Sequence, residues 1–262
     1  MVMIDIKYIK NYGKGLNIWG GFKELKSRYE DILRQYNENT IQTKNEIDRI
    51  YNEVVNEIKR IDLLKSVGLK IHINKYAANM KYIGVDFNED MSLKKESIGR
   101  LKLNNKNYNN FFAFLSFNNK NTIQRMLYMT FRLKKIDRKI RSFESKVEDI
   151  IYQREIIINN KIEVKEETVR LRKSIESLLK YISKIEREFE IHKNSIVICG
   201  QADETINEDK SKMLEYKVLQ LYNSLIEILK DIIQNKYVSW DNGIGEGKEI
   251  INKIDDLKKK MD

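Results

Sequence analysis

The feature that most constrains this chain is a stretch of 100 residues, from Arg100 to Cys199, that contains neither glycine nor proline. The whole chain of 262 residues has no proline. Proline inside a helix costs about 3 kcal/mol, so its absence permits helices of unusual length. Because 41% of the residues are hydrophobic, the chain can also bury a core, which argues against wholesale disorder.

Within this stretch, apolar side chains recur alternately three and four residues apart, as they do on one face of a long helix. Of 17 such positions, 13 are apolar. The repeat predicts one very long helix over about 120–192, roughly 110 Å in length, and a seam this long is typical of coiled coils. The positions are Ile136, Ile140, Phe143, Val147, Ile150, Arg154, Ile157, Lys161, Val164, Thr168, Leu171, Ile175, Leu178, Ile182, Ile185, Phe189 and His192.

Shorter apolar repeats predict a first helical arm over 22–81, with a kink at Gly68, and two C-terminal helices over 209–236 and 248–261. The long heptad helix occupies 120–193 in this division. The arm's repeat passes through Ile58, Ile61 and Leu64. We therefore predict a mainly all-α fold, a single elongated helical domain over 1–262 built as an antiparallel coiled coil or helical bundle.

An antiparallel hairpin would bring two polar stretches together. If the first arm folds back on the long helix, paired positions add up to about 201, and the polar interval 37–45 faces Lys161. The long helix has polar seam residues there, at Arg154, Lys161 and Thr168. Polar layers of this kind set helix register at some cost in stability. The alternative is that both stretches are solvated where the hairpin opens.

The connection between the two arms, over 82–119, is expected to form a small tip. Weak strand signals occur at 1–10 and at 82–103, where Tyr82, Ile83 and Val85 precede Phe87. These signals predict an irregular or short-β tip over about 82–118.

Positive charge is concentrated in the tip and in the start of the long helix. The window 94–141 holds 13 basic and two acidic residues, a balance of +11, whereas the whole chain carries +10. A one-sided basic patch attracts anionic partners. The predicted partner-binding patch is Lys120, Arg125, Arg132, Lys134, Lys135, Arg138, Lys139 and Arg141, with the tip aromatics Tyr108, Phe111, Phe112, Phe114 and Phe117 beside it. The alternative is that these aromatics close the bundle core while the lysines are merely solvated.

Sequence signals for catalysis or for cofactor binding are missing. The two histidines, His72 and His192, have no metal-ligand spacing with other ligand residues. Gly13-Lys14-Gly15 does not complete a phosphate-binding loop. Cys199 is the one cysteine, which excludes an internal disulfide. We expect no catalytic residue, no metal and no cofactor.

Three functions remain open. The first is a non-enzymatic structural or adaptor protein whose basic, aromatic segment 94–141 docks an anionic partner, with a protein partner or a homo-oligomer formed through the coiled coil. The second is a membrane-acting protein, similar in outline to α-helical pore-forming toxins, whose tip 107–117 contacts lipid. The third is a nucleic-acid-binding protein that uses helix 120–141. Since no signal peptide is evident, the expected compartment is the cytoplasm, with leaderless export left open.

Overall fold

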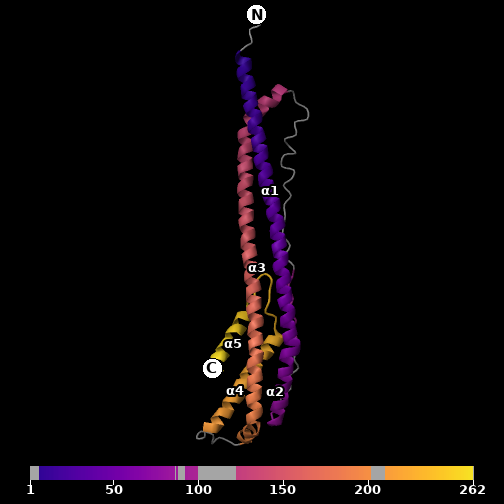
Figure 1. Ribbon diagram of the computed structural model, residues 1–262, viewed down its shortest axis with the longest axis vertical. Coiled ribbons are helices and arrows are strands. Elements are labelled where there is room, and N and C mark those ends of the chain that lie inside the picture. Colours follow the sequence, from indigo (N-terminus) through magenta and orange to yellow (C-terminus); the bar gives the residue numbers. More distant parts are fainter. Residues whose placement is uncertain (1–5, 86, 88–91, 100–121, 202–209, 262) are drawn as a thin grey trace. The chain divides into compact units, whose positions relative to one another are not determined.

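The computed structural model describes residues 6–85, 87, 92–99, 122–201 and 210–261, and the side chains of 20–21, 23–85, 87, 92–99, 135–192 and 216–259. In chain order the elements are α1 (Ile6–Leu63), the π-helical segment η1 (Leu64–Leu69), α2 (Lys70–Tyr82), α3 (Thr122–Gln201), α4 (Lys210–Gln234) and α5 (Gly247–Met261) (Figure 1). Within these described ranges no strand of a sheet forms, so the prediction of a mainly all-α fold is confirmed.

The long helix is confirmed, and α3 runs without interruption over 80 residues. It continues to Gln201, whereas the predicted long helix ends at residue 193. Helix α1 begins at Ile6 instead of at residue 22, with Trp19-Gly20-Gly21 inside it. A glycine costs a helix only about 1 kcal/mol relative to alanine, so neighbouring turns can carry the helix through the pair. Helices α4 and α5 lie where the two C-terminal helices were predicted.

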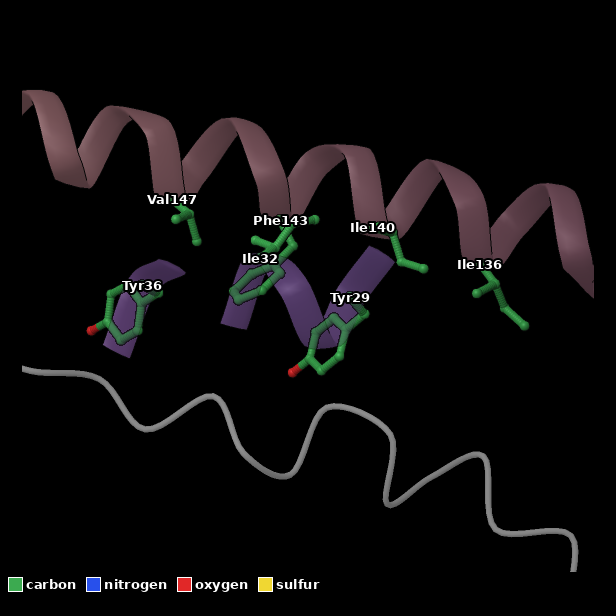
Figure 2. Close-up of a cluster of buried hydrophobic side chains, with 7 residues drawn as sticks. All are labelled: Tyr29, Ile32, Tyr36, Ile136, Ile140, Phe143 and Val147. Atoms are coloured by element: carbon green, nitrogen blue, oxygen red, sulfur yellow. The ribbon is translucent and has the colours of Figure 1, made fainter. Parts of the chain in front are cut away.

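The chain divides into two compact units: unit 1 is Met1–Asp48 with Lys102–Asn159, and unit 2 is Arg49–Leu101 with Asn160–Asp262. In unit 1, one face of α1 packs on one face of α3. Figure 2 shows the buried side chains directed toward one another: Tyr29, Ile32 and Tyr36 of α1, and Ile136, Ile140, Phe143 and Val147 of α3. The four α3 residues are predicted seam positions, so the seam is buried by another part of the same chain.

The helix formed by α1, η1 and α2 is parallel to α3 within each unit, so the predicted antiparallel hairpin is wrong. Contacting residues in an antiparallel pair have a constant sum of residue numbers, whereas those in a parallel pair have a constant difference. The differences are 116 and 115 in unit 1, and 115 and 114 in unit 2. These pairs are Arg28–Glu144 and Asn39–Arg154, then Glu57–Arg172 and His72–Glu186.

The length of the connection explains why a parallel pair is possible. Helix α2 ends at Tyr82 and α3 begins at Thr122, which leaves 39 residues between them. An extended chain of that length can reach roughly 130 Å, more than the roughly 115 Å that α1, η1 and α2 occupy together as helix. Consecutive helices joined by a short loop fold back on each other, whereas a connection this long imposes no such direction.

Arg154, the first polar seam residue, is buried in unit 1. Its guanidinium donates a 2.9 Å hydrogen bond to Asn39 Oδ1 and lies 4.9 Å from the centre of the Tyr36 ring. Thr43, one turn after Asn39, is also buried. Two polar stretches therefore do meet, as predicted, but through the parallel register.

The other two polar seam residues are buried in unit 2 with different partners. The Lys161 ammonium donates to the backbone carbonyl of Trp240 and lies 5.0 Å from the centre of that indole ring. Thr168 donates to the Val164 carbonyl, 2.7 Å away in its own helix. Both polar groups are thus satisfied inside the seam, as buried polar groups must be.

Segment η1 changes which residues face the core in the helix that α1 begins. Buried positions there are spaced four apart three times in succession: Ile61, Lys65, Leu69 and Ile73. A π turn takes up one extra residue and keeps such positions on one face. Lys65 therefore takes the buried position predicted for Leu64, and the expected kink at Gly68 is a π-helical turn in which Gly68 approaches Leu179 of α3.

In unit 2, α4 contacts η1, α2 and α5. Helix α4 is apolar over a broad face, whereas α5 presents a narrow stripe at the helical spacing of four and three residues. The buried side chains are Val218, Tyr222, Leu225, Ile226, Ile228, Leu229, Ile232 and Ile233 of α4, and Ile250, Ile254 and Leu257 of α5. Helices α4 and α5 therefore complete the core of unit 2, beside α3 and the helix formed by α1, η1 and α2.

The predicted short strands are wrong wherever the structure describes them. Residues 6–10 belong to α1, and 82–85, 87 and 92–99 form no strand. The one backbone contact from 92–99 to a helix end is the Lys94 amide donating to the Ile233 carbonyl at 3.0 Å. A single such bond does not make a ladder, because a strand pair needs a repeating series of them.

The parallel register can be tested by cross-linking inside unit 2. With Cys199→Ser as background, Glu57→Cys with Arg172→Cys should react with a short bismaleimide within one chain, because the two side chains contact each other. Glu57→Cys with Glu186→Cys should not, since fourteen residues of helix separate the levels by roughly 21 Å. Gel mobility of the monomer reports the result, and efficient cross-linking of the second pair would contradict the parallel register.

Candidate docking surface

Part of the predicted patch lies outside the described residues. Lys120 and the tip aromatics Tyr108, Phe111, Phe112, Phe114 and Phe117 are in this group. The backbone of Arg125, Arg132 and Lys134 is helical in α3, but their side chains are not described. The predicted tip at 107–117, and with it the lipid contact, therefore stays a prediction.

The remaining four patch residues, Lys135, Arg138, Lys139 and Arg141, are all exposed on α3 in unit 1. Their placement follows from the buried residues between them: Ile136 and Ile140 face α1, so the intervening bases point away from the core. We define these four residues as the basic face of unit 1. The sequence therefore identified side chains that the structure brings together on one helix surface.

Acidic neighbours neutralise part of this basic face. Asp137 pairs with Arg141 at 3.0 Å and with Arg28 of α1 at 3.7 Å. Lys135 and Arg138 form no ion pair with any residue whose side chain is described. Their charges remain available to an incoming anion.

Unit 2 has a buried ion pair that the sequence analysis missed. Lys65 donates to Glu96 Oε1 at 2.6 Å, and both side chains are completely inaccessible to solvent. The ammonium also donates to the carbonyls of Lys94 and Asn235, at 3.4 and 2.8 Å. Every donor of Lys65 is therefore used, which leaves it structural and not poised for chemistry.

Glu96 is equally saturated by its surroundings. Its carboxylate accepts hydrogen bonds from the backbone amides of Tyr237 and Val238, between 3.0 and 3.1 Å. Its own amide donates to Asp62 at 3.0 Å. The pair thus joins η1, the segment 92–99 and the chain after α4. No sequence signal indicated it, because the partners are 31 residues apart and neither belongs to an apolar repeat.

The chain after α4 is fixed on α3 by a second set of contacts. Glu167 accepts the Ile244 amide at 3.2 Å and pairs with Lys248. Gly243 has a φ of +70°, and a Cβ there would lie 2.5 Å from Glu167 Oε2. Glycine is needed at this position both for the left-handed backbone and for the close approach of Glu167. The loop over 241–247, which holds three glycines, therefore has a packing role.

Asp231 of α4 anchors the start of the chain that follows this helix. Tyr237 donates to its Oδ1 at 2.9 Å, Asn235 donates to Oδ1 at 2.6 Å, and Lys253 of α5 lies 3.3 Å from Oδ2. Burial alone would raise the pKa of Asp231, but these hydrogen bonds hold it below its usual value. Burial, together with Asp231, raises the pKa of Tyr237 above its usual range, so its hydroxyl stays a donor.

A polar cluster joins α2 to α3. Glu186, buried, lies 2.6 Å from His72 Nδ1 and 3.2 Å from Lys75 Nζ. Among the described residues, no group of three or more His, Cys, Asp or Glu side chains is arranged to hold a metal ion. Nor is any helix of the described chain both long and apolar enough to span a bilayer.

Comparison of the chain with protein-family models, with curated proteins and with solved structures finds no match.

The buried pair can be tested by Glu96→Leu. This change leaves the Lys65 charge and two backbone amides without their acceptor, so we expect a loss of about 3–5 kcal/mol in the free energy of unfolding. Urea unfolding followed by circular dichroism measures it. The matched control, Asp256→Leu, removes the exposed pair with Lys259 and should cost about 1 kcal/mol or less. Equal, small losses in both variants would contradict the burial of Lys65 and Glu96.

The Asp231 network predicts a stability that depends on pH. A carboxyl whose pKa is lowered by folding stabilises the fold above its unfolded pKa, and loses this effect as the pH falls through its folded pKa. Wild type should therefore exceed Asp231→Asn in melting temperature at pH 7, and the gap should narrow below about pH 4. A gap that is independent of pH would contradict the lowered pKa of Asp231.

Proposed function

We propose that the protein is a non-enzymatic helical adaptor whose basic segment docks an anionic partner protein. The observation that supports this most is the pair of unneutralised, exposed cations Lys135 and Arg138 on α3. Ile136, Ile140 and Phe143 hold the same helical turns against α1, so the cations are displayed on a fixed support. A rigid display of charge lowers the entropy lost on binding.

An exposed surface fits this role better than the α3 seam does. The seam residues Val147, Leu171 and Ile182 are already buried within the chain. A homo-oligomer through that seam would require the helices to separate first. A partner that recognises the basic face of unit 1 needs no such change. The cytoplasm, predicted from the sequence, is the compartment we propose for this activity.

The test is binding of the full chain to three polyanions: poly-L-glutamate, duplex DNA and vesicles of mixed neutral and anionic phospholipid. We expect salt-sensitive binding to poly-L-glutamate, lost on combining Lys135→Glu, Arg138→Glu and Lys139→Glu with helicity unchanged. The control combines Lys44→Glu, Lys81→Glu and Lys217→Glu, which alters net charge equally on other exposed residues and should retain binding.

Each other outcome overturns the adaptor proposal. Preference for DNA, with affinity falling steeply between about 50 and 200 mM salt, would indicate nucleic-acid binding through helix 120–141. Preference for anionic vesicles would indicate a membrane-acting protein. If the triple reversal leaves binding to poly-L-glutamate unchanged, the basic face of unit 1 is only solvated surface.

A further inference from the structure

Unit 2 carries a second surface, formed where the helix of η1 and α2 lies beside α3. Three large apolar side chains are exposed at successive spacings of four: Leu63 at 62%, Val67 at 51% and Ile71 at 49%. Four bases of α3 are also exposed, Lys173, Lys180, Lys184 and Arg187. We define these seven residues as the mixed face of unit 2.

The contacts between the helices place both rows on the same side. Consecutive residues of a helix are about 100° apart around its axis. In α3, Ile185 is buried in the core, Glu186 contacts His72, and Arg187 is exposed beyond that contact. In α2 the order is reversed: Ile73 enters the core, His72 contacts Glu186, and Ile71 emerges. For two parallel helices, these opposite orders put Ile71 and Arg187 on the same side, away from the core.

The same arrangement recurs about two and four turns earlier along the pair. Leu178 is buried, Leu179 meets Gly68, and Lys180 is exposed. Leu171 is buried, Arg172 contacts Glu57, and Lys173 is exposed. The apolar row and the cationic row therefore run alongside each other over several turns of both helices.

The charges of this face are not satisfied by the chain itself. None of the four α3 bases has an acidic partner among the side chains that the structure describes. Among the acids beside them, Glu57 and Glu176 pair with Arg172, Glu186 pairs with Lys75, and Glu190 has an interaction of its own. Lys59 and Lys70, also exposed, add positive charge on the α1 and α2 side of the apolar row.

We infer that the mixed face of unit 2 binds an acidic amphipathic helix of a partner protein. Such a helix presents an apolar stripe at the i, i+4, i+7 spacing, flanked by Asp and Glu, which complements an apolar row with cations on either side. A second copy of this chain would oppose like charges across a two-fold interface. Duplex nucleic acid offers phosphates but nothing for three exposed apolar side chains. This inference is independent of the basic face of unit 1.

The experiment uses the full chain and a labelled synthetic helix of about 20 residues, with leucine along one stripe and glutamate on both flanks. A second peptide carries lysine in place of glutamate. Fluorescence anisotropy should show that wild type binds the acidic peptide and not the basic one. Combining Lys180→Glu with Lys184→Glu should weaken acidic-peptide binding at least about tenfold and create binding to the basic peptide.

Two further variants separate the contributions. Leu63→Gln, Val67→Gln and Ile71→Gln together should abolish binding of the acidic peptide while circular dichroism is unchanged. Lys135→Glu with Arg138→Glu, in unit 1, should leave acidic-peptide binding intact, which distinguishes this inference from the proposed function.

The inference is overturned by any of three results. The first is equal binding of the acidic peptide by wild type and by the Lys180/Lys184 variant, or no binding by wild type. The second is preferential binding to anionic vesicles that is lost in the apolar variant, which would assign the face to lipid. The third is self-association in light scattering that is lost in the same variant, which would assign it to a second copy.

Discussion

The burial of the α3 seam is the interaction on which the rest of the structure depends. A helix with one continuous apolar face is unstable alone in water, because burying that face lowers the free energy by about 25 cal/mol per Å². In unit 1, α1 covers the described part of the seam. In unit 2, α3 contacts the end of α1 through Glu57, α2 through His72 and α4 through the Tyr222 ring. The positions left over on α3 are then obliged to face outward, and these are where the unpaired bases lie.

Polar groups inside this seam restrict how the helices can pack. Arg154 requires Asn39 and Tyr36 opposite it, and Lys161 requires the Trp240 carbonyl. A slip of one turn would leave a buried charge without its hydrogen bonds, which costs more than an apolar mismatch. The buried pair Lys65–Glu96 does the same for the segment 92–99 and for the chain after α4. A few buried polar contacts therefore restrict the register in which these helices pack.

The two docking proposals share one physical basis. Both use cations on helices whose opposite faces are buried. These helices are already ordered before a partner binds, which lowers the entropy cost of binding. They differ in chemistry: the basic face of unit 1 offers charge, whereas the mixed face of unit 2 adds an apolar row beside it. Charge supplies attraction at a distance, and apolar anchors supply affinity at contact.

The sequence by itself determined that the chain is helical, that one helix runs far beyond ordinary length, and that Lys135, Arg138, Lys139 and Arg141 face outward. These follow from local rules, namely the absence of proline and the 3.6-residue period, and the period was strong enough to place Arg154, Lys161 and Thr168 in the buried seam. Only the tertiary structure decided the direction of pairing, because a periodic apolar face packs equally well on a parallel or an antiparallel partner. It also decided that Lys65 and not Leu64 turns inward, because a π turn is stabilised by the contacts around it, and that Leu63, Val67 and Ile71 share a side with the bases of α3. Those outcomes depend on residues far apart in the chain, whose proximity no local spacing encodes.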